Sequence, residues 1–247
     1  FMALEMYKIQ RYMKLNDMQA VFGMLGGSKE VKMDAKQRIN WYRTPLPKEE
    51  LRALTRRSDA MGWLQTGGYL LVILSSGALA FWAWRNLAWP WWVAAVFLHG
   101  TLYGFLVNAM HELSHGTVFK TKALNEFFLG LVSFLGCNSP VFFRASHTRH
   151  HQSTLHPPDD GEVVLPIEMT LRQYLKSAIV DLPRLKAAWA QHFRLAVGRC
   201  GPEWEQKVVC ENEPVRRQAM RWSRFVIAGH ALIVAVSLAF GLWVVPL

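Results

Sequence analysis

Three long stretches of this chain carry no charged side chain, and they restrict its fold more than any other feature of the sequence. They are residues 63–84, 86–110 and 225–247 of 247. Because an α-helix rises about 1.5 Å per residue, roughly 20 apolar residues cross the hydrocarbon core of a bilayer. A buried helix of a soluble protein rarely stays uncharged over such a length. The three runs therefore predict transmembrane helices in an all-α, polytopic membrane protein.

The first two runs are separated by little more than Arg85, so we expect them to form a tight transmembrane hairpin. Tryptophan rings prefer the interface between membrane and water. Five tryptophans near the turn are therefore predicted to lie at one interface: Trp82, Trp84, Trp89, Trp91 and Trp92.

The distribution of positive charge predicts the orientation of the hairpin. Residues 1–62 hold 12 of the 28 lysines and arginines, the hairpin turn holds Arg85, and residues 111–224 hold the other 15. Because cytoplasmic segments carry the excess of these residues, the N-terminus and the middle of the chain are predicted to be cytoplasmic, at the inner membrane if the source is bacterial. The net charge of +10 suits anionic membrane lipid on this face, and we expect no nucleic-acid partner.

The expected organisation has four parts. Residues 1–62 form a cytoplasmic N-terminal segment, 63–110 the hairpin, 111–224 a cytoplasmic histidine-box region with a helical cap, and 225–247 the third transmembrane helix. Residues 1–40 show no clean periodicity. Pro47, followed by acidic residues, predicts the start of an interfacial helix before the first span. Apolar residues at helical spacing after residue 170 predict amphipathic cytoplasmic helices.

Five histidines fall in two tight groups after the second apolar run. His111 and His115 stand in HELSH, and His147, His150 and His151 stand in HTRHH. Residues three or four apart on a helix share one face, so each group can present its imidazoles together. Neutral imidazole is a ligand for iron, copper, zinc and nickel. We therefore predict a metal site made by these five side chains.

The segment between the two groups indicates how they can meet. Its apolar residues are interrupted at 136–140 (GCNSP), which favours a re-entrant or interfacial segment over an uninterrupted fourth span. Such a segment returns His147 to the side where His111 begins. The second span itself is expected to continue as one helix through His111 and His115, because no Pro or Gly lies between Gly104 and Gly116.

The other histidines, the cysteines and two charged clusters are given no role in the metal site. His99 is expected to be a hydrogen-bonded residue inside the membrane, His156 a loop residue, and His192 and His230 isolated structural residues. The clusters EWEQK and ENEPVRRQ are expected to be solvated loops and caps. The cysteines form no CxxC pattern and are expected to be reduced on the cytoplasmic side: Cys137, Cys200 and Cys210.

Two metal chemistries fit at least part of this pattern. The sequence from His111 to His115 matches HExxH, in which two histidines bind zinc and the glutamate, here Glu112, acts as the general base of a metalloprotease. A membrane-bound zinc protease is therefore one alternative. It needs only one further protein ligand, however, and gives no reason for the HxxHH pattern that follows.

Both boxes together resemble those of the membrane fatty acid desaturase and hydroxylase superfamily, over roughly residues 40–247. The matching motifs are HELSH within NAMHELSHGTVFKTKALNEFFLG and HTRHH within FRASHTRHHQSTLHPPDD. The resemblance implies two iron ions held by the five histidines. It further implies that a double bond, or a hydroxyl group, is introduced into an acyl or other lipid chain, with O2 and with two electrons from a ferredoxin, rubredoxin or cytochrome b5-type donor.

Two carboxylates are candidates to orient the histidines, namely Glu112 and one of Asp159 and Asp160. The superfamily pattern also includes a third HxxHH box after a second hairpin, and five histidines are too few for two octahedral iron shells. We therefore expect the sequence to be the N-terminal part of a longer desaturase-type chain. A homologue that keeps two boxes for a structural metal, without catalysis, remains a further alternative.

Overall fold

The computed structural model describes residues 45–162, 170–174 and 181–242. Within these residues all regular elements are helical, and three helices are long and apolar enough to cross a membrane. The predicted fold class, an α-helical membrane protein, is thereby confirmed. The predictions for residues 1–40, and for most of the helix expected after residue 170, fall outside the described residues; 171–174 form a helical turn.

The first span is one continuous helix from Asp59 to Asn86. Ser58 caps its start, because the Ser58 hydroxyl accepts a hydrogen bond from the backbone N–H of Met61. The interfacial helix predicted after Pro47 precedes it as α3 (Lys48–Leu54) and buries no residue. The span itself consists of three segments: α4 (Asp59–Gly62), the π-helical turn η1 (Trp63–Gly67) and α5 (Gly68–Asn86).

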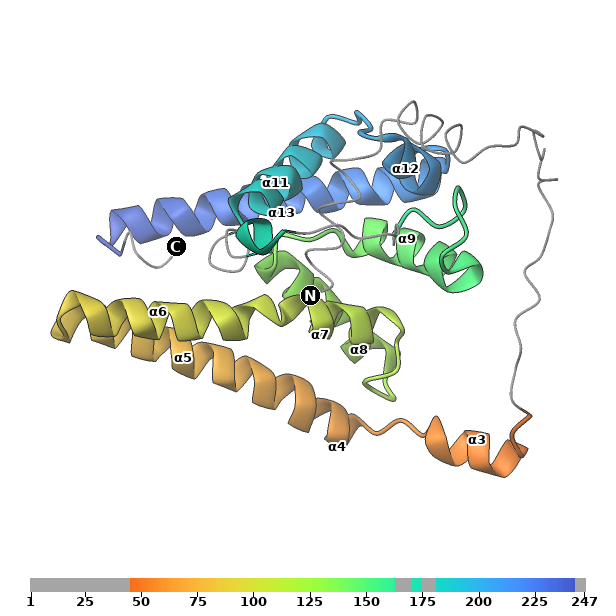
Figure 1. Cartoon of the computed structure of the whole chain (residues 1–247), viewed down its shortest axis with the longest axis horizontal. Helices are drawn as coiled ribbons and strands as arrows, with labels where there is room; N and C mark the ends of the chain where they lie inside the picture. The colour runs from red at the N-terminus through yellow and green to blue at the C-terminus, as the bar shows by residue number, and fades with distance from the viewer. Residues whose placement is uncertain (1–44, 163–169, 175–180, 243–247) are drawn as a thin grey trace.

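The second span packs antiparallel along α5 and completes the predicted hairpin (Figure 1). It consists of α6 (Trp89–Gly104) and α7 (Leu106–Ser114). Pro90 lies in the first turn of α6. Backbone N–H groups there form no hydrogen bond within the helix, so the absence of an N–H in proline costs nothing. The sequence predicts one helix, and residues 89–114 do form one span, with a single departure from α-helical hydrogen bonding at Phe105. This departure directly follows Gly104, a residue type that weakens helices.

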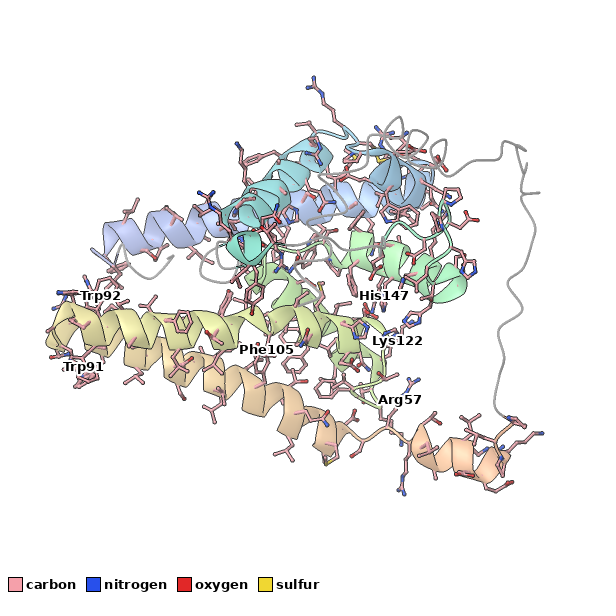
Figure 2. The ribbon with its side chains drawn as sticks, in the orientation of Figure 1. Arg57, Trp91, Trp92, Phe105, Lys122 and His147 are labelled. Atoms are coloured by element: carbon pink, nitrogen blue, oxygen red, sulfur yellow. A yellow bond between two sulfur atoms is a disulfide. The ribbon has the colours of Figure 1, made fainter. Side chains whose placement is uncertain are left out.

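The two ends of the hairpin differ in chemistry. Trp91 and Trp92 lie at its turn, whereas Arg57 and Lys122 lie at the other end of the molecule, on the same side as His147 (Figure 2). Trp91 is 68% exposed. These tryptophans and cationic side chains therefore lie towards opposite ends of the hairpin, and their location at membrane interfaces stays a prediction.

The chain then turns back through α8 (Lys122–Leu135) and α9 (Pro140–Ser153), which meet at an angle of 108° at the predicted interruption. Each of four successive carbonyls at this bend accepts a hydrogen bond from a side chain. Because unpaired backbone groups are costly in an apolar medium, these contacts stabilise the turn that returns α9 towards α7. The donors are Tyr103 Oη to Leu135 O (2.8 Å), Asn138 Nδ2 to Gly136 O (2.9 Å), His192 Nε2 to Cys137 O (3.2 Å) and Trp222 Nε1 to Asn138 O (2.9 Å).

The third span begins earlier than predicted. Its helix, α13 (Glu213–Ala239), includes most of the ENEPVRRQ cluster, which the sequence predicts as solvated loops and caps. Most of the cluster is exposed and Asn212 caps the helix, as predicted, but residues 213–218 are helical and the prediction of a loop is wrong there. The physical reason is a strong helix start, since the Asn212 side chain accepts a hydrogen bond from the N–H of Val215. A second helix, α11 (Leu182–Ala196), packs along α13 (Figure 1).

Cys200 and Cys210 form a disulfide, so the prediction of reduced thiols is wrong for this pair, while Cys137 is free. A search for CxxC patterns cannot find partners ten residues apart, whose Cα atoms come within 6.4 Å only after the chain between them has folded. EWEQK is also not a solvated loop, since it contributes to two helical segments and its Glu205 is 2% exposed. The segments between the cysteines are α12 (Glu203–Glu205) and the π-helical turn η2 (Gln206–Cys210).

Helix α9 joins two apolar cores. Phe143 packs into the core between the hairpin and α8, and its neighbour Phe142 packs into a second core between α11, η2 and α13. Successive residues of a helix point about 100° apart, so one turn of α9 contacts both halves of the molecule. The histidines of α9 are thereby fixed relative to both.

Candidate metal centre

His111 and His115 come from the C-terminal end of α7. Met110 and Leu113, on another face of the same helix, are buried in the first apolar core. Full burial of such a side chain stabilises the fold by roughly 1.5–3 kcal/mol, so these residues fix the rotation of α7 about its axis. The two histidines therefore project away from this core, and His115 forms the end of the helix.

His147, His150 and His151 come from the last turns of α9. The His147 side chain is buried and stacks on Phe143, with ring centroids 4.9 Å apart. The bend between α8 and α9 brings these turns beside the end of α7, so that the ring centroids of His111 and His147 are 4.6 Å apart. The two sequence groups therefore meet as predicted.

Four of the five predicted ligands converge. One ring nitrogen from each of His111, His115, His147 and His151 lies within 4.8 Å of those of the other three. The Nε2 atoms of His111 and His115 are 3.4 Å apart, and those of His147 and His151 are 2.9 Å apart. The fifth histidine, His150, is not part of this group.

These spacings fit a single transition-metal ion. An imidazole nitrogen lies about 2.1 Å from such an ion, so two neighbouring ligand nitrogens lie about 3.0 to 3.4 Å apart for bond angles between about 90° and 109°. The Nε2 separations within each pair, 2.9 and 3.4 Å, are close to this range, and the four nitrogens together lie within 4.8 Å of one another. An all-imidazole donor set suits iron, copper, nickel or zinc, so the cluster could hold an ion of any of these metals.

Carboxylates hold the second ring nitrogen of three histidines. An ionised carboxylate can only accept hydrogen bonds, so each of these rings donates from Nδ1 and keeps the lone pair of Nε2 for a metal. The three pairs are His111 Nδ1 with Glu112 Oε1 (2.8 Å), His147 Nδ1 with Glu162 Oε1 (2.8 Å) and His150 Nδ1 with Asp160 Oδ2 (3.0 Å).

The sequence indicates two of these carboxylates and misses the third. Glu112 and Asp160 are among the predicted candidates, whereas Asp159 instead accepts a hydrogen bond from Lys207 Nζ (2.8 Å). Glu162, which is 5% exposed, was missed. The only signal for it is its place in the short acidic stretch DDGE after the second box, and that stretch does not tell which carboxylate turns inward.

Burial lowers the pKa of His115. The imidazoles of His111, His147 and His151 lower this pKa further, because a positive charge on the His115 ring would be repelled by positive charge on these neighbouring rings. The carboxylate of Glu112 acts in the opposite direction. At pH 7 the His115 ring is therefore in its neutral form, which is the form that binds metal ions.

The remaining histidines lie outside this cluster. His99 Nδ1 lies 2.9 Å from Ser76 Oγ, inside the hairpin as expected. His192 and His230 do not stand alone, because both contact Cys137: Nε2 of His192 lies 3.2 Å from the Cys137 carbonyl oxygen and Nε2 of His230 lies 3.3 Å from its Sγ. Both contacts lie at the bend between α8 and α9.

Comparison with known proteins finds a family match. A family model described as fatty acid desaturase matches residues 88–247, which include both histidine groups, the bend between α8 and α9, and the third span. No curated protein and no solved structure matches the chain. The resemblance drawn from the two histidine boxes is thereby confirmed.

Proposed function

The chain belongs to the fatty acid desaturase family, and on this premise we propose that it is a membrane-bound iron oxygenase. The proposed reaction introduces a double bond, or a hydroxyl group, into an acyl or other lipid chain, using O2 and two electrons. The observation that carries this proposal is the convergence of His111, His115, His147 and His151, whose ring nitrogens lie within 4.8 Å of one another.

We assign one iron to this four-histidine cluster and a second iron to a site that includes His150. The His150 ring centroid lies 5.6 Å from that of His147 and 5.8 Å from that of His151, beside the cluster but outside it. Asp160 holds Nδ1 of His150, which leaves Nε2 for a metal. When bound, iron supplies the reductive activation of O2 that breaking an unactivated C–H bond requires.

The residues of the chain hold and orient the site. Glu112, Asp160 and Glu162 fix the ring orientation of three histidines, and the two apolar cores hold α7 and α9 against each other. The transmembrane hairpin keeps the cluster close to the membrane, where an acyl substrate is found. The bilayer is thus both the support of the site and the source of its substrate.

We further propose that the end of the molecule carrying His147 faces the cytoplasm and receives the electron donor. Arg57 and Lys122 lie at this end, opposite Trp91 and Trp92 (Figure 2). An excess of cationic side chains favours the cytoplasmic side. The same charges would steer an acidic redox partner of the ferredoxin, rubredoxin or cytochrome b5 type towards the metal centre.

The geometry gives little support to the zinc protease alternative. A catalytic zinc site keeps three protein ligands and an open position for water, whereas four imidazoles converge here. In HExxH proteases the glutamate activates that water, yet here Glu112 Oε1 lies 2.8 Å from Nδ1 of His111, the nitrogen that faces away from His115 Nε2. Glu112 therefore orients a ligand.

The proposal is tested by expressing the protein in a host membrane, supplying O2, a reduced donor and an acyl substrate, and analysing the lipid chains by mass spectrometry. The expected result is an iron-dependent double bond or hydroxyl group that is lost in the His147→Ala variant. About two irons per active protein are expected, and one zinc would favour the protease.

Two other outcomes would point to the alternatives. Peptide cleavage that disappears in the Glu112→Gln variant would support the protease and overturn the oxygenase. Iron bound at the histidines without any change in the lipid chains, in the presence of a competent donor, would support a non-catalytic homologue with a structural metal.

A further inference from the structure

The loop closed by the Cys200–Cys210 disulfide, residues 200–210, lies against the segment that carries the orienting carboxylates. Lys207 Nζ donates one hydrogen bond to the carbonyl oxygen of Pro158 (3.0 Å) and another to Asp159 Oδ1 (2.8 Å). This disulfide loop is far from both histidine boxes in the sequence. It therefore contacts the segment next to the metal centre from a part of the chain that lies outside the two histidine motifs.

Trp204, at the centre of the disulfide loop, contacts the same segment in two ways. Its Nε1–H donates to Ser146 Oγ (3.0 Å), and its ring packs directly on the backbone of Gly161. A Cβ atom at residue 161 would lie 2.5 Å from the Trp204 ring, so the indole fits only because that position is glycine. Gly161 lies between Asp160 and Glu162 in the sequence. The Trp204 ring therefore packs on the one residue that separates the two orienting carboxylates.

The hydrogen bond from Trp204 continues to a histidine of the cluster. Ser146 Oγ donates to Glu162 Oε2 (3.1 Å), and Glu162 Oε1 accepts from His147 Nδ1 (2.8 Å). The direction of each bond is fixed, because an indole N–H only donates, a hydroxyl has one proton, and a carboxylate only accepts. Ser146 and Glu162 are 1% and 5% exposed, so water cannot easily replace a missing partner.

The position of Trp204 is itself fixed by its neighbour Glu205. Both oxygens of this buried carboxylate are used: Oε1 accepts from the backbone N–H of Gly201 (2.7 Å) and Oε2 from Gln191 Nε2 on α11 (2.9 Å). The disulfide loop is therefore tied to α11 on one side and to residues 158–162 on the other. Val208 and Val209 of the same loop belong to the second apolar core, so the loop links this core to the segment that carries the orienting carboxylates.

We propose that Trp204 is a positioning residue of the metal centre, which sets the orientation of the His147 ring through Ser146 and Glu162. The inference rests on the proposed function in taking the four-histidine cluster as the metal site. It adds a residue 57 positions beyond His147 in the sequence to the groups that determine metal affinity.

The expected effects follow from the order of the contacts. Glu162 holds the ligand directly, so Glu162→Gln is expected to weaken metal binding about 10- to 100-fold, the usual effect of losing such a partner. Trp204→Phe removes one neutral hydrogen bond two steps away and keeps an aromatic ring over Gly161. Its expected effect is about two- to tenfold.

The test is a titration of the metal-free, detergent-purified full chain with Co²⁺ in competition with a chromophoric chelator. The absorption bands of bound Co²⁺ report the ligand geometry, which a change in overall stability alone would not alter. The variants are Trp204→Phe, Ser146→Ala and the double variant. Tyr69→Phe is the control, because it also loses a hydrogen bond from an aromatic side chain, to the carbonyl oxygen of Leu102 (2.8 Å), within the transmembrane hairpin and away from the cluster.

The proposal predicts weaker Co²⁺ binding and shifted bands for Trp204→Phe, wild-type values for Tyr69→Phe, and no additional loss when Trp204→Phe is added to Ser146→Ala. It is overturned if Trp204→Phe binds Co²⁺ like the wild type, or if Tyr69→Phe loses as much affinity. Should Trp204→Phe not fold, wild-type affinity in Ser146→Ala overturns it equally. Failure of the wild type to bind Co²⁺ would instead reject the metal centre, and with it the proposed function.

Discussion

Replacing His115 with alanine removes one of the four nitrogens that converge within 4.8 Å. Four-ligand structural sites bind zinc with about 10–16 kcal/mol, which corresponds to roughly 3 kcal/mol for each ligand. Since 1.4 kcal/mol is a factor of ten in a dissociation constant, His115→Ala should weaken binding of the first metal ion by about 100-fold. The assay is chelator competition with Co²⁺, following the dissociation constant of the first equivalent bound.

His150→Ala is the matched control, because it removes the same kind of side chain from α9, next to His151. His150 lies outside the four-histidine group, and Asp160 Oδ2 keeps the backbone N–H of Leu155 as a partner (2.8 Å). The first equivalent should therefore bind His150→Ala within about threefold of the wild type, a difference below 1 kcal/mol. Equal losses in both variants would refute the assignment of four histidines to one ion.

Three further predictions concern the support of the site. Gly62→Ala should destabilise the protein by about 1–3 kcal/mol, because the new Cβ would lie 2.5 Å from the buried ring of Phe119. Thermal unfolding in detergent should show a lower midpoint for this variant. Gly68→Ala is the control and should unfold like the wild type, because its Cβ would meet nothing within 4 Å. Asn125→Ala should cost about 2–6 kcal/mol by the same assay, since it leaves the buried N–H and C=O of Phe119 without the Asn125 amide. Thiol titration of the denatured chain should count one thiol before reduction and three after it, and three at the outset would show that the disulfide is absent.

The sequence predicts the parts of this structure that depend on local patterns. Uncharged runs of sufficient length predict the spans, because the bilayer thickness sets a minimum length. The interruption between Gly136 and Pro140 predicts the bend, since Gly and Pro disfavour a continuous helix. His111 and His115 are four residues apart on α7, as are His147 and His151 on α9, so their convergence within each helix follows from helix geometry alone.

Contacts between distant parts of the chain cannot be predicted in this way. Glu162 is one of several acidic residues after the second box, and only the folded loop places its carboxylate beside His147. Trp204 bonds to Ser146 across 58 residues, and Cys200 meets Cys210 only once α12 and η2 have formed. These contacts form only through tertiary packing, and they leave no repeating pattern of residue types in the sequence.

The most direct test of the account is to locate iron in the protein by anomalous diffraction at the iron absorption edge. The account predicts an iron peak within about 2.1 Å of Nε2 of His111, His115, His147 and His151, the usual distance for imidazole ligands. A peak remote from these four rings, or a signal at the zinc edge alone, would contradict the assignment of an iron oxygenase centre to this cluster.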